Sequence, residues 1–564
     1  MPDDAVPSSV GIAEPALPSV ALKRLPPRHA VRSARGLPSW ERLAYWGLMT
    51  VGLFLVARFA VFWFNPARLP RAFGRTLEPG DFALFAGLTL VIWHRQAMEI
   101  LAWLICRRVG GRQEQPAPQR DLRVAFITTF VPGSEPLDLL SRTLANMLRA
   151  DYPHDTWLLD EGNSAAARRL CLEMGVLYFS RNGIDHYNQD RGRFLARTKA
   201  GNHNSWYEEY SSKYDIVAQI DTDFQVRPNF LTRTLGHFRN PQVAFVGTPQ
   251  GYGNVDNYIA RGAAQQTYLF YGPIMRALSH RRMALLIGAN HVIRVAALRD
   301  VGGYQGHLTE DLATGVRFHA DRWESVYVPE VLAVGEGPTT WSSYFNQQYR
   351  WAYGCMNIFF TQTLRLNFRM RPNHAVYYFL LQQFYFSGLA MVVAVILLLF
   401  YYLFGWVPAN FEVHQLVLWY LPLLAWRQVM LLWLQRFNVR PREERGLMWV
   451  GRILTIAAIP VYFLALAGVL SRRPATWKTT PKGTEGDQAD DGLGVFIPHI
   501  TLLLVIIGGL AAGIAMRHTA AVFLAWGSVT AGAMSAFVLA WIYRQVSRAL
   551  PWHRFKLRAR AKEG

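Results

Sequence analysis

The sequence is poor in cysteine and in acidic residues. Only three cysteines occur in 564 residues, without a Cys-x-x-Cys pair or a nearby histidine cluster, so neither a disulfide framework nor a zinc site is indicated. We expect Cys106, Cys171 and Cys355 to be small buried hydrophobes. Charged residues make up 17% of the chain and hydrophobic residues 51%, which is too apolar for an ordinary soluble enzyme and too polar for a chain wholly in the membrane.

The balance of charge is strongly basic. Lys and Arg number 59 against 39 Asp and Glu, a net charge of +20. Much of the excess falls beside hydrophobic stretches, where anionic lipid headgroups would attract it. Nucleic-acid binding is the competing interpretation, but the sequence has no regular basic and aromatic pattern to support it. We therefore expect a membrane-lipid partner and no nucleic acid.

Seven stretches are long enough to cross a hydrocarbon core of ~30 Å, which takes about 20 apolar residues each. They lie at 43–64, 82–105, 376–405, 412–434, 447–470, 495–516 and 520–543. Residues 1–36 are rich in Pro, Ala and Arg, lack periodicity and contain no evident export signal, which is typical of a disordered tail. The block between the second and third stretches alternates strand-like and helix-like runs and predicts one α/β domain.

The basic segments predict the orientation of these stretches. Six Lys/Arg lie in residues 1–42, four Arg in 436–446 and seven Lys/Arg in 544–564, and the positive-inside rule places all three segments in the cytoplasm. The three stretches after residue 446 then cannot all cross. We predict that 447–470 lies in the interface, because it contains Arg452 and Pro460. The alternative is a seventh span with an external C-terminus.

Three polar motifs punctuate the α/β block and its end. Asp221-Thr222-Asp223 directly follows a predicted buried strand at 215–220, and two carboxylates at i and i+2 on an extended chain point the same way. Such a pair is costly unless it is neutralised. Mg²⁺ or Mn²⁺, shared with a diphosphate, would do this, so Asp221 and Asp223 are the predicted metal ligands. The other two motifs are Thr309-Glu310-Asp311 and Gln347-x-x-Arg350-Trp351.

In this order, and between hydrophobic segments, the motifs resemble those of the membrane-embedded processive β-glycosyltransferases of family 2, which include bacterial cellulose, hyaluronan and chitin synthases. Each motif alone is unspecific. The resemblance covers about 120–545 and implies an α/β GT-A-type domain inserted between transmembrane helices. It also implies an inverting transfer in which Asp311, with Glu310 beside it, takes the proton of the acceptor hydroxyl. The alternative is that Asp311 only caps a helix at 312–320.

Further matches to the family imply the donor site. Lys199 opens a Lys-Ala-Gly-Asn turn that supports the nucleotide, and Glu135 lies in a turn where Ser134 replaces the family's Asn. Asp160 ends a predicted strand at 156–159 and would read the uracil base, although Glu161 stands in place of the family's second Asp. The alternative is that Asp160 caps the predicted helix at 164–174.

The resemblance also implies an acceptor site. Gln347, Arg350 and Trp351 share one helical face, so that Arg350 can clamp the diphosphate and Trp351 can stack on the terminal sugar. Gly288, in the stretch 285–290, corresponds to the family's acceptor region, but the Cys found there in cellulose synthases is missing.

Two segments near the C-terminus are similar to known regulatory elements. Trp477, Thr480 and Lys482 lie in a stretch that resembles the gating loop of cellulose synthases, with Trp477 and Thr479 departing from its pattern. Arg544 and Arg548 match half of a cyclic-di-GMP-binding motif, but the 16 residues that follow are too few for the barrel that completes it. We therefore expect headgroup anchoring and no cyclic-di-GMP.

Polar residues inside the stretches favour a channel, because charges at bilayer depth are costly and usually face a wet interior. These residues are His94, Arg95, Gln96, Glu99, Gln382, Gln383 and Arg427. For Glu99, snorkelling to the interface is an equal alternative, and for Arg58 it is the favoured interpretation.

The predicted organisation follows from these assignments. It comprises a cytoplasmic tail (1–42), two transmembrane helices (43–105), a cytosolic GT-A catalytic domain (106–359), an amphipathic segment with two transmembrane helices (360–446), an interface helix (447–470), a gating loop (471–494), two transmembrane helices (495–543) and a basic tail (544–564).

The sequence thus predicts a multi-pass protein of the bacterial inner membrane that polymerises glucose from UDP-glucose into a β-glucan and translocates it. Its partners would be the UDP-sugar, the growing polysaccharide and membrane lipid. Accessory export subunits are a further possible class of partner. Chitin-like, hyaluronan-like and mannan-like products stay open. So does a non-processive transferase acting on a polyprenyl phosphate.

Overall fold

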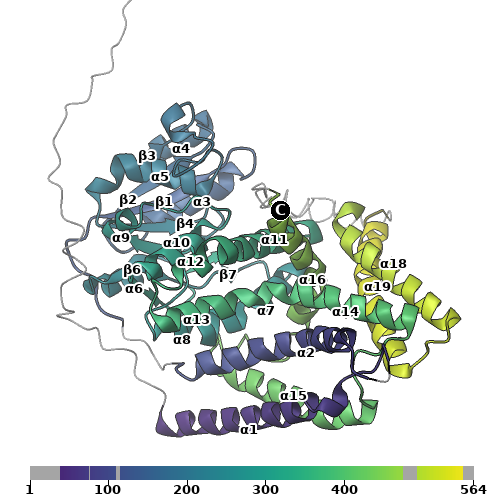
Figure 1. Ribbon diagram of the computed structural model, residues 1–564. Coiled ribbons are helices and arrows are strands. Elements are labelled where there is room, and N and C mark those ends of the chain that lie inside the picture. Colours follow the sequence, from purple (N-terminus) through teal and green to yellow (C-terminus); the bar gives the residue numbers. More distant parts are fainter. Residues whose placement is uncertain (1–37, 75, 110–114, 474–491, 550–564) are drawn as a thin grey trace, which may run out of the picture.

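The computed structural model describes residues 38–74, 76–109, 115–473 and 492–549, with side chains up to residue 543. Its α/β domain lies above a layer of long helices (Figure 1). The predicted tail at 1–36, the gating residues Trp477, Thr480 and Lys482, and the chain beyond 549 lie outside the described residues.

A seven-stranded mixed sheet forms the centre of the α/β domain, in the order β3-β2-β1-β4-β8-β6-β9. Its strands are β1 (Val124–Phe130), β2 (Asp155–Asp160), β3 (Leu177–Phe179), β4 (Ile216–Ile220), β6 (Val243–Gly247), β8 (His291–Arg294) and β9 (Glu324–Tyr327). Strands β3, β2, β1 and β4 are parallel, and β8 is antiparallel to both of its neighbours. A small second sheet joins β5 (Gln225–Val226), β10 (Ala333–Gly335) and β7 (Gly251–Tyr252).

The strands are apolar on both faces, as expected of a sheet that helices cover on both sides. One face packs against α3 (Leu137–Leu148), α4 (Ala165–Met174) and α6 (Phe230–Leu235). The other packs against α5 (Lys199–Tyr210), α9 (Val295–Asp300) and α10 (Glu310–Ala320). This arrangement confirms the predicted α/β domain of GT-A type. Strands β2 and β4 each lie within one residue of their predicted bounds.

Helices continue the domain toward the membrane side. They are α7 (Tyr258–Leu269), α8 (Met275–Ser279), α11 (Trp341–Ile358), α12 (Leu364–Leu366) and α13 (Pro372–Leu381). The long helices are α1 (Ser39–Trp63), α2 (Pro79–Cys106), α14 (Ser387–Phe404), α15 (Val413–Leu434), α16 (Trp449–Leu470), α18 (Ile497–Ala515) and α19 (Ala521–Ala549).

Six helices in the described part of the chain are long and apolar enough to cross a membrane. They are Ser39–Trp63, Pro372–Phe404, Val413–Phe437, Trp449–Leu470, Leu493–Ala515 and Ala521–Tyr543. Helix α2, one of the seven predicted stretches, does not meet this criterion, because His94, Arg95 and Glu99 interrupt its apolar run. In contrast, α16, which we predicted to lie in the interface, does meet it.

The packing of α16 differs from that of the other five helices. Along its length α16 contacts α11 and α7 of the α/β domain and α14 of the membrane side. In its most apolar window 56% of the residues are buried inside the protein, against at most 33% for the other candidates. Length and composition alone do not decide whether α16 crosses, so its interface position stays a prediction.

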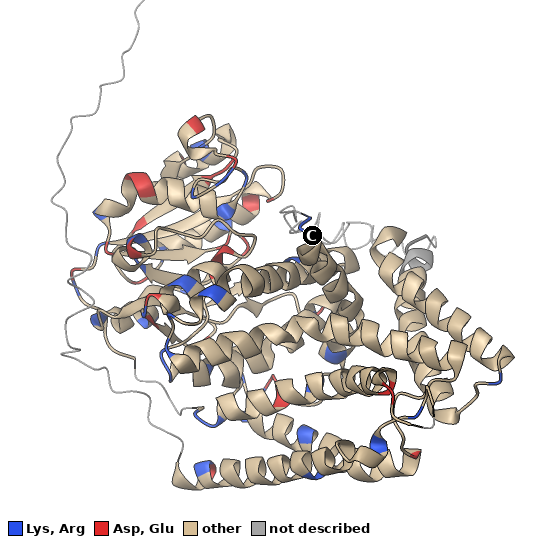
Figure 2. Ribbon diagram, in the orientation of Figure 1, with Lys and Arg blue, Asp and Glu red and all other residues tan. Residues whose placement is uncertain are grey.

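Charged side chains are sparse on the membrane-side helices, and most lie on the α/β domain (Figure 2). Two residues of the predicted polar set on α2, Glu99 and His94, contact other helices. Glu99 pairs with Arg427 of α15 through two contacts, one of 2.6 Å, and also with Arg95 at 2.9 Å. His94 lies 2.9 Å from the carbonyl of Gln383. Hence Glu99 neutralises a buried arginine and does not snorkel.

Arg58 likewise stays within the helical layer. Its guanidinium donates to the Leu418 carbonyl at 3.2 Å and lies 4.2 Å from the ring centre of Trp419. Both partners belong to α15, so Arg58 joins α1 to α15, and its predicted snorkelling stays a prediction.

The Glu99–Arg427 pair should matter for stability. We expect Glu99→Gln to destabilise the fold by about 3 kcal/mol, because it leaves the Arg427 guanidinium, 8% exposed, without its carboxylate in a low-dielectric layer. Thermal unfolding of the purified protein measures this as a lower Tm. Arg95→Gln is the matched control, since Arg95 is 65% exposed and its loss leaves the pair intact. Equal Tm values for the two variants would contradict the prediction.

Candidate active site

The acidic motif at the end of β4 forms a turn. The Phe224 N–H donates to the Asp221 carbonyl at 2.9 Å, so Asp221 and Asp223 do not lie on an extended chain as we predicted. The turn brings the two carboxylates to different partners. Asp221 accepts from Lys199 Nζ, and Asp223 Oδ2 accepts from the Glu336 N–H at 3.3 Å.

Lys199 is the cation at the centre of the site. It opens α5, where the Thr198 hydroxyl caps the helix by accepting from the Gly201 N–H at 3.1 Å. Its Nζ donates to Asp221 Oδ1 at 2.5 Å and to the Gly288 carbonyl at 3.0 Å, and lies 3.9 Å from Glu310 Oε1. Burial lowers the pKa of Lys199, but the field of Asp221 and Glu310 outweighs this effect and the pKa is raised. Lys199 is therefore a cation at neutral pH.

Glu310 and Asp311 lie in the first turn of α10. Burial raises the pKa of Asp311, although the Leu312 N–H donates to its Oδ1 at 2.7 Å. Burial also raises the pKa of Glu310 to about 7, against the field of Lys199. A carboxylate whose pKa is raised toward neutrality is a better proton acceptor, as a general base requires. Thr309 occupies the N-cap position of α10 but makes no side-chain capping hydrogen bond, so the alternative role of Asp311 at the helix start stays open.

Gly288 faces the predicted base. A β-carbon built on Gly288 would lie 3.2 Å from Asp311 Oδ2, so glycine allows the chain to approach the carboxylate closely. The predicted acceptor residue thus lies against both Asp311 and Lys199.

Glu135 lies behind the acidic turn. Its Oε2 accepts from the Val131 N–H at 3.0 Å and from the Thr222 hydroxyl at 3.2 Å. Burial, together with the fields of Asp223 and Asp221, raises the pKa of Glu135 to about 7. The residue therefore links the end of β1 to the acidic turn.

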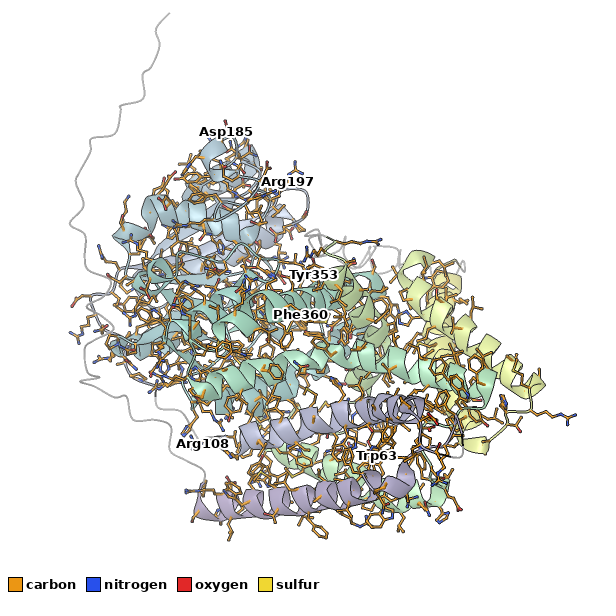
Figure 3. All side chains as sticks on the ribbon, viewed as in Figure 1. Trp63, Arg108, Asp185, Arg197, Tyr353 and Phe360 are labelled. Atoms are coloured by element: carbon orange, nitrogen blue, oxygen red, sulfur yellow. The ribbon has the colours of Figure 1, made fainter. Side chains whose placement is uncertain are left out.

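Helix α11 carries the third motif toward the same place. Gln347, Arg350 and Trp351 lie on it, and a β-carbon on Gly354 would overlap Thr309, which shows how closely α11 approaches the start of α10. Burial lowers the pKa of Arg350, opposed by the field of Glu310, Asp221 and Asp311. The Gln347 Oε1 atom is buried without a hydrogen-bond partner among the described residues. Figure 3 places Tyr353 of α11 where the α/β domain meets the membrane-side helices.

Asp160 makes local contacts beside α4, close to the alternative role that we had left open for it at the start of this helix. Its carboxylate is buried and accepts from the N–H groups of Gly162 and Ser164, at 2.9 and 2.6 Å, and from the Tyr178 hydroxyl at 2.8 Å. It therefore fixes the loop before α4. Glu161 pairs through both oxygens with the buried Arg181, at 2.6 and 2.9 Å. The uracil contact predicted for Asp160 is not among these interactions and stays a prediction.

Sequence reasoning missed a buried polar group behind Gly288. Gln219 of β4 donates to the Gly288 carbonyl at 3.1 Å, and the Tyr304 hydroxyl contacts both Gln219 and His291, each at 2.8 Å. The available signal was Gln219 itself, the one polar residue in an otherwise apolar strand.

The acidic side chains fit a divalent cation in part. Among the described residues, no three His, Cys, Asp or Glu side chains are grouped as a metal site. Asp221 and Asp223 supply two hard oxygen ligands, and the raised pKa of Glu135 reports the negative field around them. Magnesium commonly binds through one or two carboxylates, with substrate phosphates and water completing the shell. The site thus suits a cation that arrives with a diphosphate.

The acidic cluster predicts how stability depends on pH. Glu135 has a pKa of about 7 in the fold against 4.5 ordinarily, so the folded state binds this proton more tightly than the unfolded chain. The resulting stabilisation is complete below about pH 4.5 and is lost as the pH rises through about 7. We expect the Tm of metal-free protein to fall between about pH 5 and about pH 8, and Glu135→Gln to reduce that fall. Asp138→Asn, at an exposed carboxylate, is the control and should leave the fall unchanged. An equal fall in all three proteins would contradict the prediction.

Comparisons with known proteins agree with this geometry. Residues 216–434, which include all three motifs, match the family model described as glycosyl transferase family group 2. The UDP-forming cellulose synthase catalytic subunit of Dictyostelium discoideum is 33% identical over 171 residues, 29% of this chain and 16% of that protein. Cellulose synthase 2 of Novacetimonas hansenii is 25% identical over 286 residues, 49% of this chain and 16% of that protein.

The chain therefore spans about 16% of the length of these two relatives. Among solved structures, a mannosyltransferase from Pyrobaculum calidifontis in complex with GDP-Man and Mn2+ aligns with a TM-score of 0.45 and 16% identity, covering 69% of this chain and 100% of that chain. Residues 216–434 are thus similar to the family described as glycosyl transferase family group 2, and parts of the chain are similar to cellulose synthases.

Proposed function

We propose that this protein is a processive, inverting β-glycosyltransferase that polymerises glucose from UDP-glucose into a β-glucan and passes the product across the membrane. The observation that carries the proposal is the meeting of Lys199, Asp221 and Gly288 with Glu310 and Asp311 in one place. An anionic donor and an acceptor hydroxyl would find both a cation and a base there.

The reaction assigns a task to each of these groups. Asp311 takes the proton of the acceptor hydroxyl while that oxygen bonds to the anomeric carbon and the bond from this carbon to the diphosphate breaks. Lys199 and Arg350 face the charge that grows on the leaving diphosphate. Asp221 and Asp223 would hold Mg²⁺ or Mn²⁺, which when bound neutralises part of that charge. Trp351 would present its ring to the terminal sugar.

We choose UDP-glucose as the donor because the similar proteins are cellulose synthases. One of them is described as UDP-forming. Chitin-like, hyaluronan-like and mannan-like products use the same chemistry. Incubating purified protein with single UDP-sugars and digesting the product with linkage-specific glycanases separates these products.

Processive synthesis and translocation are supported by the way the site adjoins the membrane side. Helix α11, which carries Arg350, packs along α16, and α16 also contacts α14. Gln96 and Gln382 have buried amide groups for which the described part of the chain supplies no hydrogen-bond partner. Such amide groups fit the wall of a channel, where they would form hydrogen bonds with the hydroxyls of the passing sugar chain. Accessory export subunits are compatible with this arrangement.

The base and the metal ligands can be tested separately. Asp311→Asn should abolish sugar transfer yet leave metal-dependent UDP binding within about twofold, because only proton abstraction is lost. Asp223→Asn should weaken both. Calorimetric titration with UDP and Mn²⁺ measures binding, and release of UDP from the donor measures transfer. Asp256→Asn, at an exposed carboxylate of the same domain, is the control. Sustained polymer synthesis by the Asp311 variant would refute the assignment.

We further propose a cytoplasmic catalytic domain in a bacterial inner membrane, with α16 in the interface. A single cysteine at the exposed Ser471, directly after α16, should then resist an impermeant thiol reagent in intact cells. The background lacks the three native cysteines, all of which are buried. Val407→Cys is the positive control, because it lies in the 406–411 loop, which contains no Lys or Arg and is external in the proposed topology. Labelling at position 471 without lysis would mean that α16 crosses the membrane.

A further inference from the structure

The flanks of the acceptor-side segment are fixed by the burial of Met283, Ala284, Leu285, Leu286 and Ala289, whereas few hydrogen bonds hold its centre. Residues 283–290 form neither helix nor strand, so no regular backbone ladder fixes them. The Thr248 N–H donates to the Asn290 carbonyl at 3.1 Å and anchors only the end of the segment. At its centre, the Gly288 carbonyl accepts from Lys199 at 3.0 Å and from Gln219 at 3.1 Å. The position of Gly288 beside Asp311 depends on these two donors.

Gln219 is held in turn by Tyr304. The Tyr304 hydroxyl donates to Gln219 Oε1 at 2.8 Å, which orients the amide so that its nitrogen points to Gly288. The same hydroxyl lies 2.8 Å from His291 Nε2, and His291 Nδ1 lies 2.9 Å from the Ile287 carbonyl. All five groups are buried or nearly so, and a buried hydrogen bond that loses one partner is costly. Tyr304 therefore supports either the Gly288 carbonyl, through Gln219, or the Ile287 carbonyl, through His291, according to which nitrogen of His291 carries the proton.

One proton in this network is shared between two contacts. Burial, with the field of Lys199, lowers the pKa of His291 to about 3, so the imidazole is neutral and carries a single N–H. When that N–H donates to Ile287, Nε2 must accept the Tyr304 proton, and Gln219 Oε1 loses its donor. The Tyr304 hydroxyl has one proton, and both the contact with Gln219 and the contact with His291 depend on where that proton lies.

Helix α5 fixes Tyr304 itself. Asn204 donates to the Tyr304 carbonyl and accepts from the Tyr304 N–H, both at 2.8 Å. The same helix begins with Lys199, so both supports of the Gly288 carbonyl arise from α5, one directly and one through Tyr304 and Gln219. This explains why the interior of α5 is polar where a helix packed on a sheet would ordinarily be apolar.

We propose that Tyr304 and Gln219 are positioning residues for the transfer reaction, which hold the Gly288 carbonyl and thereby keep the acceptor segment against Asp311. The inference rests on the proposed function, because it assigns these residues a role in aligning the acceptor. Their hydrogen bonds lead to the acceptor segment. Their loss should therefore affect the use of the acceptor more than the binding of the donor.

Tyr304→Phe tests the proposal, and the fold supplies a matched control. Tyr207 packs 5.9 Å from the Tyr304 ring, and its buried hydroxyl has no hydrogen-bond partner within the described ranges of the chain. Tyr207→Phe thus removes a hydroxyl from the same cluster without breaking a bond. We expect Tyr304→Phe to lower sugar transfer about tenfold or more, since small misplacements of reacting groups have effects of this size. The donor KM should change less than about twofold, and hydrolysis of the donor by water should gain relative to transfer.

Hydrogen exchange supplies a readout that does not need activity. In Tyr304→Phe the amides of residues 285–290 should exchange faster than in Tyr207→Phe, because the segment loses its support. If Tyr304→Phe does not fold, Gln219→Met takes its place. This variant removes the amide that donates to the Gly288 carbonyl, with little change in side-chain volume. Equal transfer, hydrolysis and exchange in the two variants would overturn the inference. Absence of transfer by the native protein with every UDP-sugar would instead count against the proposed function, and the exchange comparison would still decide whether the network holds the segment.

Discussion

The site is organised by the need to hold several carboxylates near one buried cation. Asp221, Glu310 and Asp311 all act on Lys199, which bonds directly to Asp221 and lies 3.9 Å from Glu310. Like charges at these distances repel strongly in a low dielectric, so the cluster is stable only with Lys199 in place and Arg350 nearby. Strand β4 ends here, α5 and α10 begin here, and α11 contributes Arg350 from its middle. These four elements are therefore fixed relative to one another by charge as well as by packing.

Helix ends contribute to the same balance. Both α5 and α10 begin at the site, and the start of a helix favours negative charge because its N–H groups point outward. Glu310 and Asp311 in the first turn of α10 benefit from this, while burial acts in the opposite sense and raises their pKa values. The result is a pair of carboxylates whose pKa values are both raised, that of Glu310 to about 7. A general base needs a raised pKa of this kind, whereas a carboxylate in a purely structural ion pair does not.

Local pattern predicted the elements and their ends but not the partners of polar groups. The strand before Asp221, the helix that begins near Asp311 and the helical face of Arg350 could be recognised from short-range periodicity. The turn at Asp221 and the contacts of Asp160 depend on local hydrogen bonds. An extended chain was predicted at Asp221, and two roles were left open for Asp160. The contact of Tyr304 with Gln219 joins residues 85 positions apart, and no short-range signal specifies such a pair.

For α16, hydropathy likewise does not show whether the helix crosses the membrane. A helix can be apolar all round because lipid surrounds it or because protein does. In α16 more than half of the most apolar window, 56%, is buried against protein, whereas Val413–Phe437 buries 17% and meets the same criterion of composition. The protein that covers α16 includes α7 and α11 of the catalytic domain. Its apolar residues are thus largely accounted for by protein contacts. The hydropathy of α16 is therefore weak evidence for a crossing, and its packing favours a helix that joins the catalytic domain to the membrane layer.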